Sequence, residues 1–546
     1  VFNNEWLEKQ NYSDNNFGYG MFEKCQNLLE AEIVLPRKCE TFDSMFYDCV
    51  KLHKITKLIP NNTYNANNMF RDCTSLVDYP SFELGGTKPV YYMYMFDGAG
   101  SNAMSLSSIK HIVIPKNARN CNYMFSDCQR ILDTCSFEMG YINDKNGNMI
   151  RLDYAGMFYN CKSIIDSSNC IFPSRTSSAV SCFSDCSNMK FVSSGFENNE
   201  LYDYDEYDAQ PDSYKKSLYF MFGSCVNLND VSNFVLPKNR WFNLSGMFYN
   251  CINLQIGPKI HEKCYPKYMN QLFYNCRNLI TCSFDAIPTS AINYKQMFSE
   301  CAKLVKAPFF RENTFDLCYE IAEKYYNYTN LNYQINCHSI YSDCNSMTGF
   351  IEQDHELLLP LNASYDFAFP NCFNFEKALP FNLTDNYHSN TSCYSMYKNC
   401  ISLVDISNII IPKSVSALGY MFFYDSIYCN RDKGRTTFPT FESDTLIANN
   451  VSAEGMFYRN FKKSNNISIP ESFQFPKGVI NLKSAFEECD GIRDASNLVI
   501  KSCVTNCVNT FKKCVKLQFL PKFEITVSGG NCTCDYMFSD IANQSP

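Results

Sequence analysis

The chain has 546 residues, a formal net charge of −8, 45% hydrophobic residues and 19% charged residues. There is enough apolar material for a large folded body and too little charge for a disordered chain. The sequence also lacks the block of Lys and Arg that neutralises nucleic-acid phosphates, and it lacks the run of roughly 20 apolar residues that spans a membrane.

One phrase recurs along the whole chain: an apolar residue, Phe or sometimes Tyr, two variable residues, Cys, two variable residues and an apolar residue. Copies begin at Met21, Met45, Met69, Met124, Met157, Cys182, Met221, Met247, Leu272, Met297, Ile340, Ala368, Met396, Ala485 and Thr510, with degenerate copies at Met95, Met421, Met456 and Met537. The closest copies are 24 to 26 residues apart. About 19 copies at this spacing indicate a repeat solenoid.

A second element follows the cysteine by roughly ten residues in several copies, as a short β-branched run stopped by Pro. It occurs at Glu32–Pro36, His111–Pro115, Asn233–Pro237 and Asn408–Pro412. Because Pro cannot donate to the next ladder bond, each run predicts a short strand. One such strand cannot bury its apolar face alone, whereas stacked repeats pair their strands in parallel and extend one core. We therefore expect a leucine-rich-repeat-like solenoid with one short parallel strand per repeat, irregular or short helical return segments and a curved parallel sheet.

The aromatic residue of the phrase falls at the same depth in every repeat of such a stack. We expect these side chains to form an internal aromatic column rather than a ligand site. The column would include Phe22, Phe46, Phe70, Phe125, Phe158, Phe222 and Phe248.

These two elements resemble those of the BspA-type, or Treponema pallidum-type, leucine-rich repeat family, which has a variant in a mycoplasma surface-protein family. Met45–Leu52 fits the core of that repeat, and Ile55–Pro60 fits its strand, although Leu58 departs from the alternation. The resemblance covers nearly the full chain. It implies a curved parallel sheet, surface exposure and adhesion, and it supplies no catalytic residues. Similar repeats also occur in phage fibres and protist surface proteins, so the resemblance implies the fold more closely than the role.

Along the chain we expect an N-terminal flank or cap at 1–20, repeats at 21–312, a helical insertion at 313–339, and repeats at 340–546 with the last one incomplete. Within the insertion, apolar residues at helical spacing predict an amphipathic helix near 314–326. The acidic stretch Leu201–Asp208 is interpreted as a solvated loop in preference to a Ca²⁺ site, because it lacks the spacing of a calcium loop.

Two further interruptions are predicted to be turns or loops. Asn-Gly within Asp144–Asn148 favours a hairpin turn. The basic segment Cys429–Arg435 is expected to be an exposed loop and a potential contact site, since insertions in solenoids often emerge on the binding face.

Half of the 30 cysteines occupy the repeat position: Cys25, Cys49, Cys73, Cys128, Cys161, Cys186, Cys225, Cys251, Cys276, Cys301, Cys344, Cys372, Cys400, Cys489 and Cys514. A small hydrophobe with a weak donor suits an internal ladder, and side chains that point the same way form disulfides poorly. We expect reduced, buried thiols there. Among the rest, Cys503, Cys507, Cys532 and Cys534 are near enough to pair, but the well-spaced pairs of a zinc site are absent, so no metal or cofactor is predicted.

The six histidines fall in different repeats without a catalytic or metal-binding pattern, so we do not expect an enzyme. Sequons that would carry glycans in a eukaryotic secretory host occur at Asn11, Asn61, Asn243, Asn327, Asn362, Asn382, Asn390, Asn450, Asn466, Asn531 and Asn543.

The sequence therefore predicts an extracellular or cell-surface repeat protein that acts by adhesion, with a protein or glycan as its ligand. The alternatives are a receptor-binding fibre of a phage or other virion, and a subunit of a head-to-tail filament. The chain begins at Val1 rather than Met, which suggests a processed chain or a fragment. A repeat that opens at Met537 is cut off at Pro546, so either the gene continues, or another chain covers that end, or the terminal residues form minimal caps.

Overall fold

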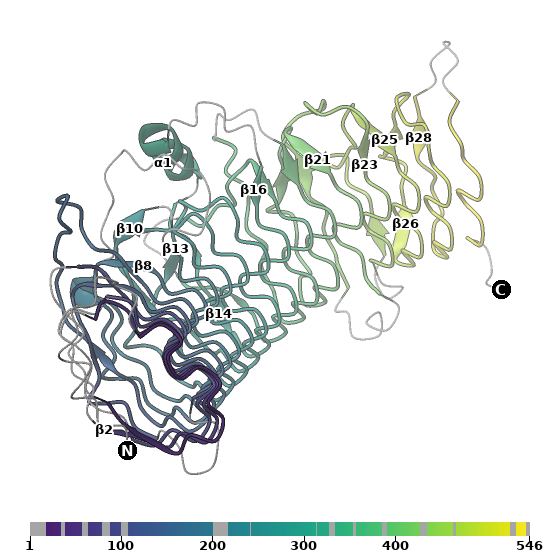
Figure 1. Ribbon diagram of the computed structural model, residues 1–546. Coiled ribbons are helices and arrows are strands. Elements are labelled where there is room, and N and C mark those ends of the chain that lie inside the picture. The colour runs from purple at the N-terminus through teal and green to yellow at the C-terminus, as the bar shows by residue number, and fades with distance from the viewer. Residues whose placement is uncertain are drawn as a thin grey trace. The chain divides into compact units, whose positions relative to one another are not determined.

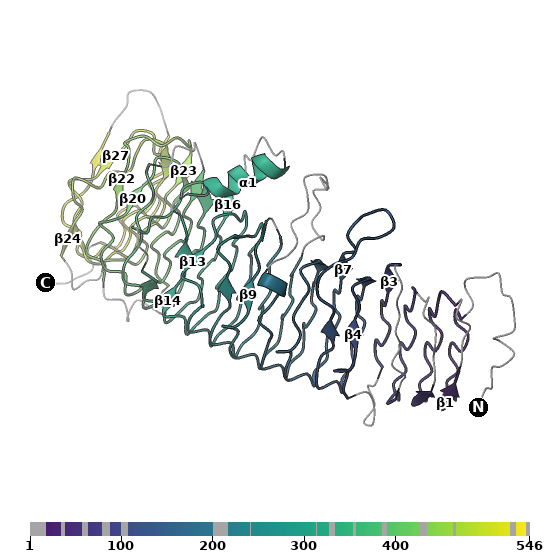
Figure 2. The ribbon, with the colours of Figure 1, turned by 90° about the vertical axis from the view of Figure 1, so that its left-hand side faces the viewer.

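The computed structural model describes residues 18–33, 39–56, 64–78, 88–99, 107–199, 217–240, 242–312, 314–326, 334–352, 356–384, 390–425, 434–461, 466–524 and 531–541. Over these residues the chain is a parallel β-solenoid of about 17 turns with almost no helix, which confirms the predicted fold class. It divides into unit 1, which comprises 1–266 and 275–284, and unit 2, which comprises 267–274 and 285–546. Within each unit, successive turns lie side by side (Figures 1 and 2).

The strands of unit 1 are only two or three residues long. They are β1 (Glu30–Glu32), β2 (Lys54–Thr56), β3 (Val90–Tyr91), β4 (Val113–Ile114), β5 (Ala118–Asn120), β6 (Ser136–Phe137), β7 (Leu152–Asp153), β8 (Thr176–Ser178), β9 (Val235–Leu236), β10 (Asn239–Arg240), β11 (Lys259–Ile260) and β12 (Cys264–Tyr265), with a 3-10 turn, η1, at Glu197–Asn199. Strands β3, β5, β7 and β8 form one parallel sheet in that order.

Unit 2 is also built from parallel strands of two or three residues. Its strands are β13 (Ala286–Ile287), β14 (Lys306–Ala307), β15 (Phe309–Phe310), β16 (Ile335–Asn336), β17 (Gly349–Phe350), β18 (Ala363–Ser364), β19 (Thr391–Ser392), β20 (Ile410–Ile411), β21 (Val415–Ala417), β22 (Thr440–Phe441), β23 (Val451–Ser452), β24 (Ile467–Ser468), β25 (Val479–Asn481), β26 (Ile492–Asp494), β27 (Val499–Ile500) and β28 (Lys522–Phe523), with helix α1 at Asp316–Tyr326. Strands β16, β18, β19 and β21 form its parallel four-stranded sheet.

Three of the four predicted strands before Pro are confirmed, and most of the fourth run, 34–36, lies outside the described residues. The runs at 111–115, 233–237 and 408–412 contain β4, β9 and β20, and these pair in parallel with β6, β11 and β22 of the following turns. The structure adds other ladders to this one. The strands of the two four-stranded sheets lie a few residues before the apolar-aromatic dipeptide of their turns. A further ladder, formed by β14 and β17, lies a few residues after the cysteine. Each turn is therefore hydrogen-bonded to its neighbours at several places.

Two left-handed residues bracket the apolar-aromatic dipeptide in most of the described turns. In one turn of unit 1 they are Ser44 and Asp48, with φ of 58° and 59°, and in another they are Ser181 and Asp185, with φ of 51° and 63°. This conformation costs an L residue roughly 1–2 kcal/mol, least for Asn and Asp. The cost explains why Asp and Asn recur directly before the cysteine.

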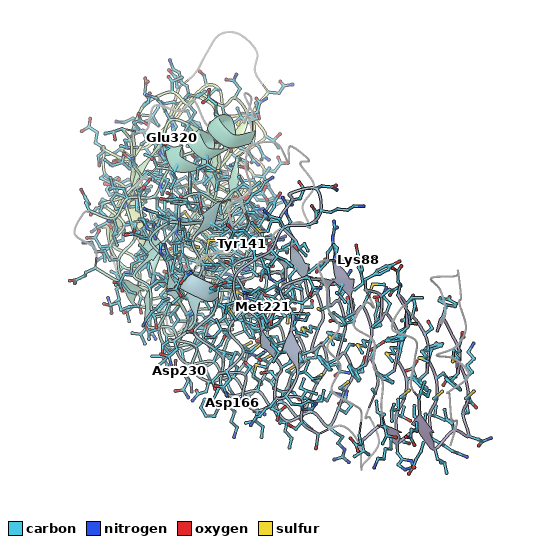
Figure 3. The ribbon with its side chains drawn as sticks, turned by 60° about the vertical axis from the view of Figure 1, so that its left-hand side comes forward. Lys88, Tyr141, Asp166, Met221, Asp230 and Glu320 are labelled. Carbon is cyan, nitrogen blue, oxygen red and sulfur yellow. The ribbon has the colours of Figure 1, made fainter. Side chains whose placement is uncertain are left out.

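Aspartates also stabilise the outer corners of the turns. Asp166 and Asp230, labelled along one edge of unit 1 in Figure 3, each accept a hydrogen bond from the backbone N–H two residues ahead, that of Ser168 and that of Ser232, both at 2.7 Å. Met221 lies in the core with none of its surface exposed. Exposed apolar side chains, Ile165 and Phe191, lie beside Asp166 at this edge, whereas Met221 shows the apolar character of the core.

The predicted aromatic column is confirmed within each unit. Ring centroids of Phe125 and Phe158 lie 5.6 Å apart with an interplanar angle of 7°, and those of Phe158 and Phe183 lie 5.0 Å apart. In unit 2, Tyr341 and Tyr397 take the place of Phe in the same column. Offset aromatic pairs at this spacing add stabilisation beyond area burial. The column is the centre of each unit's core.

Two predicted interruptions of the array are confirmed. Helix α1 occupies Asp316–Tyr326, and Phe315 beside it packs at 5.1 Å against Phe310 of unit 2. The turn at 144–148 is a hairpin in which the Asp144 N–H donates to the Asn148 carbonyl at 2.7 Å, with an antiparallel bridge between 143 and 149.

The prediction of an exposed basic loop at 429–435 is wrong at Arg435, which has none of its surface exposed. Its Nε donates to Asn460 Oδ1 at 2.6 Å, and its Nη1 donates to the Leu403 carbonyl at 2.8 Å. These acceptors hold the guanidinium inside the solenoid. Residues 429–433 and the acidic stretch 201–208 lie outside the described residues.

Candidate ligand-binding surface

The repeat-position cysteines form a hydrogen-bonded ladder. From Cys49 onward, each thiol donates to the carbonyl oxygen of the aromatic residue one turn earlier, as Cys73 does to Phe46 at 3.1 Å and Cys161 to Phe125 at 2.9 Å. Burial raises the pKa of the buried thiols Cys73 and Cys161, and it raises that of Cys251 to about 12. A thiol that stays protonated remains a donor, so the ladder acts as a structural element.

Cys25 is the exception to the predicted burial, because it is exposed. A ladder thiol is covered by the turn that precedes it, and Cys25 lies in the first described turn. The other ladder positions are buried: Cys49, Cys73, Cys128, Cys161, Cys186, Cys225, Cys251, Cys276, Cys301, Cys344, Cys372, Cys400, Cys489 and Cys514.

The sequon asparagines differ in accessibility. Asn390, Asn450, Asn466 and Asn531 are exposed, Asn243 and Asn362 are half-buried, and Asn11, Asn61, Asn327 and Asn543 lie outside the described residues. Asn382 is buried, and its Oδ1 accepts the Thr384 hydroxyl at 2.7 Å. A glycan at Asn382 would require the side chain to leave this position.

A second set of aromatic side chains, the aromatic row, lies outside the core of unit 2. It consists of Phe367, Tyr394, Tyr420, Phe423 and Tyr458, all partly exposed. Neighbouring ring centroids along the row are 5.3–5.8 Å apart. These residues follow the sheet strands β18, β19, β21 and β23, so the solenoid turns set the spacing of the rings.

The backbone of the aromatic row is strained at two rings. Phe367 has φ of 54° and Tyr420 has φ of 55°. Both residues occupy the left-handed position before the apolar-aromatic dipeptide that recurs along the solenoid, and Tyr94, Tyr123 and Phe220 of unit 1 occupy it as well. Glycines make room for the rings: a Cβ on Gly419 would lie 3.0 Å from the Tyr394 ring, and one on Gly455 would lie 2.3 Å from the Tyr420 ring.

The aromatic row borders a cavity of about 400 Å³. It is lined by Tyr394, Ser416, Ala417, Gly419, Tyr420, Asn450, Ser452 and Glu454. Its carboxylate is held in place, because Glu454 Oε1 accepts the Tyr420 hydroxyl at 3.0 Å and forms an ion pair with Lys483 Nζ at 3.1 Å. Partial burial, and then the charge of Glu454, raise the pKa of Tyr420, so its hydroxyl stays a donor.

A second cavity, of about 260 Å³, lies along the same sheet of unit 2. It is lined by Lys295, Gln334, Asn336, His338 and Ser364. Burial, followed by the charge of Lys295, lowers the pKa of His338. The imidazole is therefore neutral at pH 7, where one ring nitrogen donates and the other accepts. The two cavities give one face of unit 2 a series of hydroxyl, amide and imidazole groups between aromatic rings.

This arrangement suits recognition of a polar ligand. Tyr, Ser, Gly and Asn supply rigid amphipathic area and adaptable hydrogen bonds in other binding surfaces. Sequence reasoning did not single out Tyr394, Tyr420 or Glu454, because they occupy variable positions of the repeat. The available signal was an aromatic residue directly before the apolar-aromatic dipeptide, as at Phe367 and Tyr420.

No family model and no curated protein matches the chain. Solved structures that resemble it include two leucine-rich repeat proteins. One, a leucine-rich repeat protein from Bacteroides ovatus, is 16% identical, with 78% of this chain and 87% of that chain covered and a TM-score of 0.37. Another, a leucine-rich cell surface protein from Faecalibacterium prausnitzii, is 13% identical, with 86% and 89% covered and a TM-score of 0.29. TM-scores this low support no conclusion about this chain beyond the fold described above. Among the described residues, no helix has the length and apolar character to cross a membrane.

Proposed function

We propose that this chain is a non-enzymatic, extracellular or cell-surface binding protein of the BspA-type leucine-rich repeat kind, and that it acts in adhesion by binding a glycan. The observation that carries this proposal is the cavity beside the aromatic row of unit 2. Its rings, hydroxyls and single anchored carboxylate lie on one face of successive turns.

The chemistry of the cavity favours a glycan over a protein as the ligand. A sugar ring presents a C–H face that packs on an aromatic ring, and hydroxyls that need both donors and acceptors. Tyr394 is 37% exposed and supplies such a ring, while Glu454 and Asn450 at its side supply the acceptors and donors. A protein hot spot would instead centre on a fully desolvated apolar pocket.

The proposal is tested by screening the purified chain against an array of neutral and acidic glycans and against peptides. The test variants are Tyr394→Ala, which removes a ring, and Gly419→Ala, which introduces a Cβ 3.0 Å from that ring. Tyr141→Ala is the matched control, because Tyr141 is an exposed tyrosine of unit 1.

We expect glycan binding by the parent chain and the control, and a loss of affinity of about tenfold or more in Tyr394→Ala, as for a hot-spot aromatic. Binding of peptides alone would contradict a glycan ligand. Glycan binding that Tyr394→Ala leaves unchanged would show that the ligand occupies another surface.

A further inference from the structure

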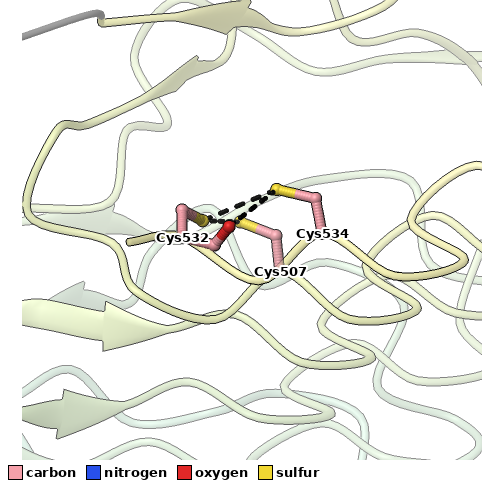
Figure 4. A group of neighbouring side chains, drawn as sticks. All are labelled: Cys507, Cys532 and Cys534. Carbon is pink, nitrogen blue, oxygen red and sulfur yellow. Dashed lines mark hydrogen bonds between the residues drawn. The ribbon is translucent and has the colours of Figure 1, made fainter. Parts of the chain in front are cut away.

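Three cysteines outside the thiol ladder come together in the last described turns of unit 2. The Cys532 Sγ lies 3.7 Å from Cys507 Sγ and 3.6 Å from Cys534 Sγ (Figure 4). All three sulfurs lie within 4.8 Å of one another. The sequence suggested pairing among these residues and did not predict a metal site.

The solenoid itself creates this cluster. Asn506 and Thr533 form a parallel bridge between two turns, and the Cys507 N–H donates to the Thr533 carbonyl at 2.7 Å. Cys532 and Cys534 flank Thr533, and residues two apart on an extended strand point to the same side. Their thiols therefore both meet Cys507 from the neighbouring turn.

The spacing of the sulfurs fits a metal ion. Zinc–thiolate bonds of about 2.3 Å in a tetrahedron place sulfurs about 3.8 Å apart, close to the 3.6 Å and 3.7 Å found here. A disulfide would bring two sulfurs to about 2.05 Å and leave the third thiol without a role.

The burial of the three thiols differs in a way that suits an ion at the surface. Cys507 is buried, whereas Cys532 and Cys534 are exposed. Three adjacent thiolates repel one another, and a bound cation removes that repulsion. The exposed side leaves a fourth position open to water or another ligand.

We propose that Cys507, Cys532 and Cys534 bind one Zn²⁺ ion or a similar thiolate-binding d10 ion. This ion crosslinks the last described turn to the turn before it. The ion would link a thiolate of one turn to two thiolates of the next. Its binding would stabilise that turn by mass action, since only the folded arrangement presents all three ligands.

The test is anaerobic titration of the reduced, metal-free chain with Co²⁺, a spectroscopic probe of zinc sites, followed by displacement with Zn²⁺. We expect thiolate-to-cobalt absorption that saturates at about one equivalent per chain. Cys534→Ser removes an exposed ligand with little risk to folding, and it should weaken binding by about tenfold or more, in the range of affinity losses that metal sites show on mutation. The control is Cys503→Ser, since Cys503 lies in the same turn as Cys507 but its sulfur is directed to the Val479 carbonyl at 3.6 Å.

Hydrogen exchange supplies a second readout. Zn²⁺ should slow exchange of the 531–541 amides in the parent chain and in Cys503→Ser, but not in Cys534→Ser. The proposal is overturned if the reduced parent chain shows no cobalt absorption or if Cys534→Ser binds cobalt as tightly as the parent. A disulfide from Cys532 to Cys507 or Cys534 in the freshly isolated chain would overturn it as well.

Discussion

The side-chain amide of Asn460 donates to the carbonyl oxygen of Phe422 at 2.5 Å, which is the bond that a ladder cysteine makes elsewhere. The same side chain accepts a hydrogen bond from Nε of the buried Arg435 at 2.6 Å. The Arg435 guanidinium also lies 4.8 Å from the centroid of the Phe422 ring. Asn460 therefore has two roles: it replaces a thiol of the ladder, and it accepts a hydrogen bond from the buried guanidinium of Arg435.

Asn460→Cys should destabilise unit 2, because it can restore the ladder bond but leaves Nε of Arg435 without this acceptor. A lost hydrogen bond to a charged group costs about 1.5–3 kcal/mol, and urea unfolding should show a loss of that order. Arg435→Leu added to Asn460→Cys should recover part of the loss, because the buried charge is then gone. Equal stability of Asn460→Cys and the parent chain would show that Asn460 does not stabilise Arg435.

Phe158→Ala should destabilise unit 1 by about 3–5 kcal/mol, the usual cost of removing a buried aromatic ring. Phe158 has none of its surface exposed and stacks on rings both above and below it. Phe191→Ala is the control, because Phe191 is 57% exposed and its loss should change the unfolding free energy little. Similar losses of unfolding free energy in the two variants, measured by urea unfolding, would show that the stacked column does not stabilise unit 1 more than an exposed ring does.

The thiol ladder predicts instability at alkaline pH. Burial raises the pKa of Cys251 and Cys400 from 9.0 to about 12. In the unfolded chain these thiols ionise near 9.0, so at higher pH the unfolded state binds fewer protons than the folded state and stability falls as pH rises. The loss is about 1.4 kcal/mol per pH unit for each thiol until its folded pKa is reached.

Cys251→Ser isolates one of these thiols, because a serine hydroxyl can donate to the same carbonyl but does not titrate in this range. Unfolding free energies measured from about pH 10 to about pH 11 should fall less steeply in Cys251→Ser, by about 1.4 kcal/mol per pH unit. Equal slopes in the variant and the parent chain would show that the thiol is ionisable in the folded state.

Native thiol labelling should separate the cysteines by exposure. In chelator-treated protein we expect rapid labelling of Cys25, Cys532 and Cys534, which are exposed. The buried ladder thiols, such as Cys73 and Cys161, should react only after denaturation, since the reactive species is the thiolate. Rapid native labelling of the ladder, or disulfides from turn to turn, would contradict a ladder of reduced, buried thiols.

The parallel solenoid and its aromatic column could be predicted from the sequence because Phe and Cys recur at fixed places that face the core. The aromatic row could not, since Tyr394 and Tyr420 occupy positions that vary from repeat to repeat, and their placement depends on left-handed backbone and on glycines in the next turn. The sequence suggested that Cys507, Cys532 and Cys534 could pair, but the arrangement of three thiols around one point was not predicted, for another reason. Cys507 and Cys532 are 25 residues apart, which is one turn of the repeat, and sequence proximity alone does not show that they share a column.

The most direct test of the proposed binding function is a hydrogen-exchange footprint of the chain with and without a saturating glycan from the array. We expect slowed exchange at residues 416–420 and 450–454, which line the cavity beside the aromatic row, and no change in the same segments of Tyr394→Ala. Slowed exchange confined to unit 1, or an identical footprint in Tyr394→Ala, would contradict a binding site on this face of unit 2.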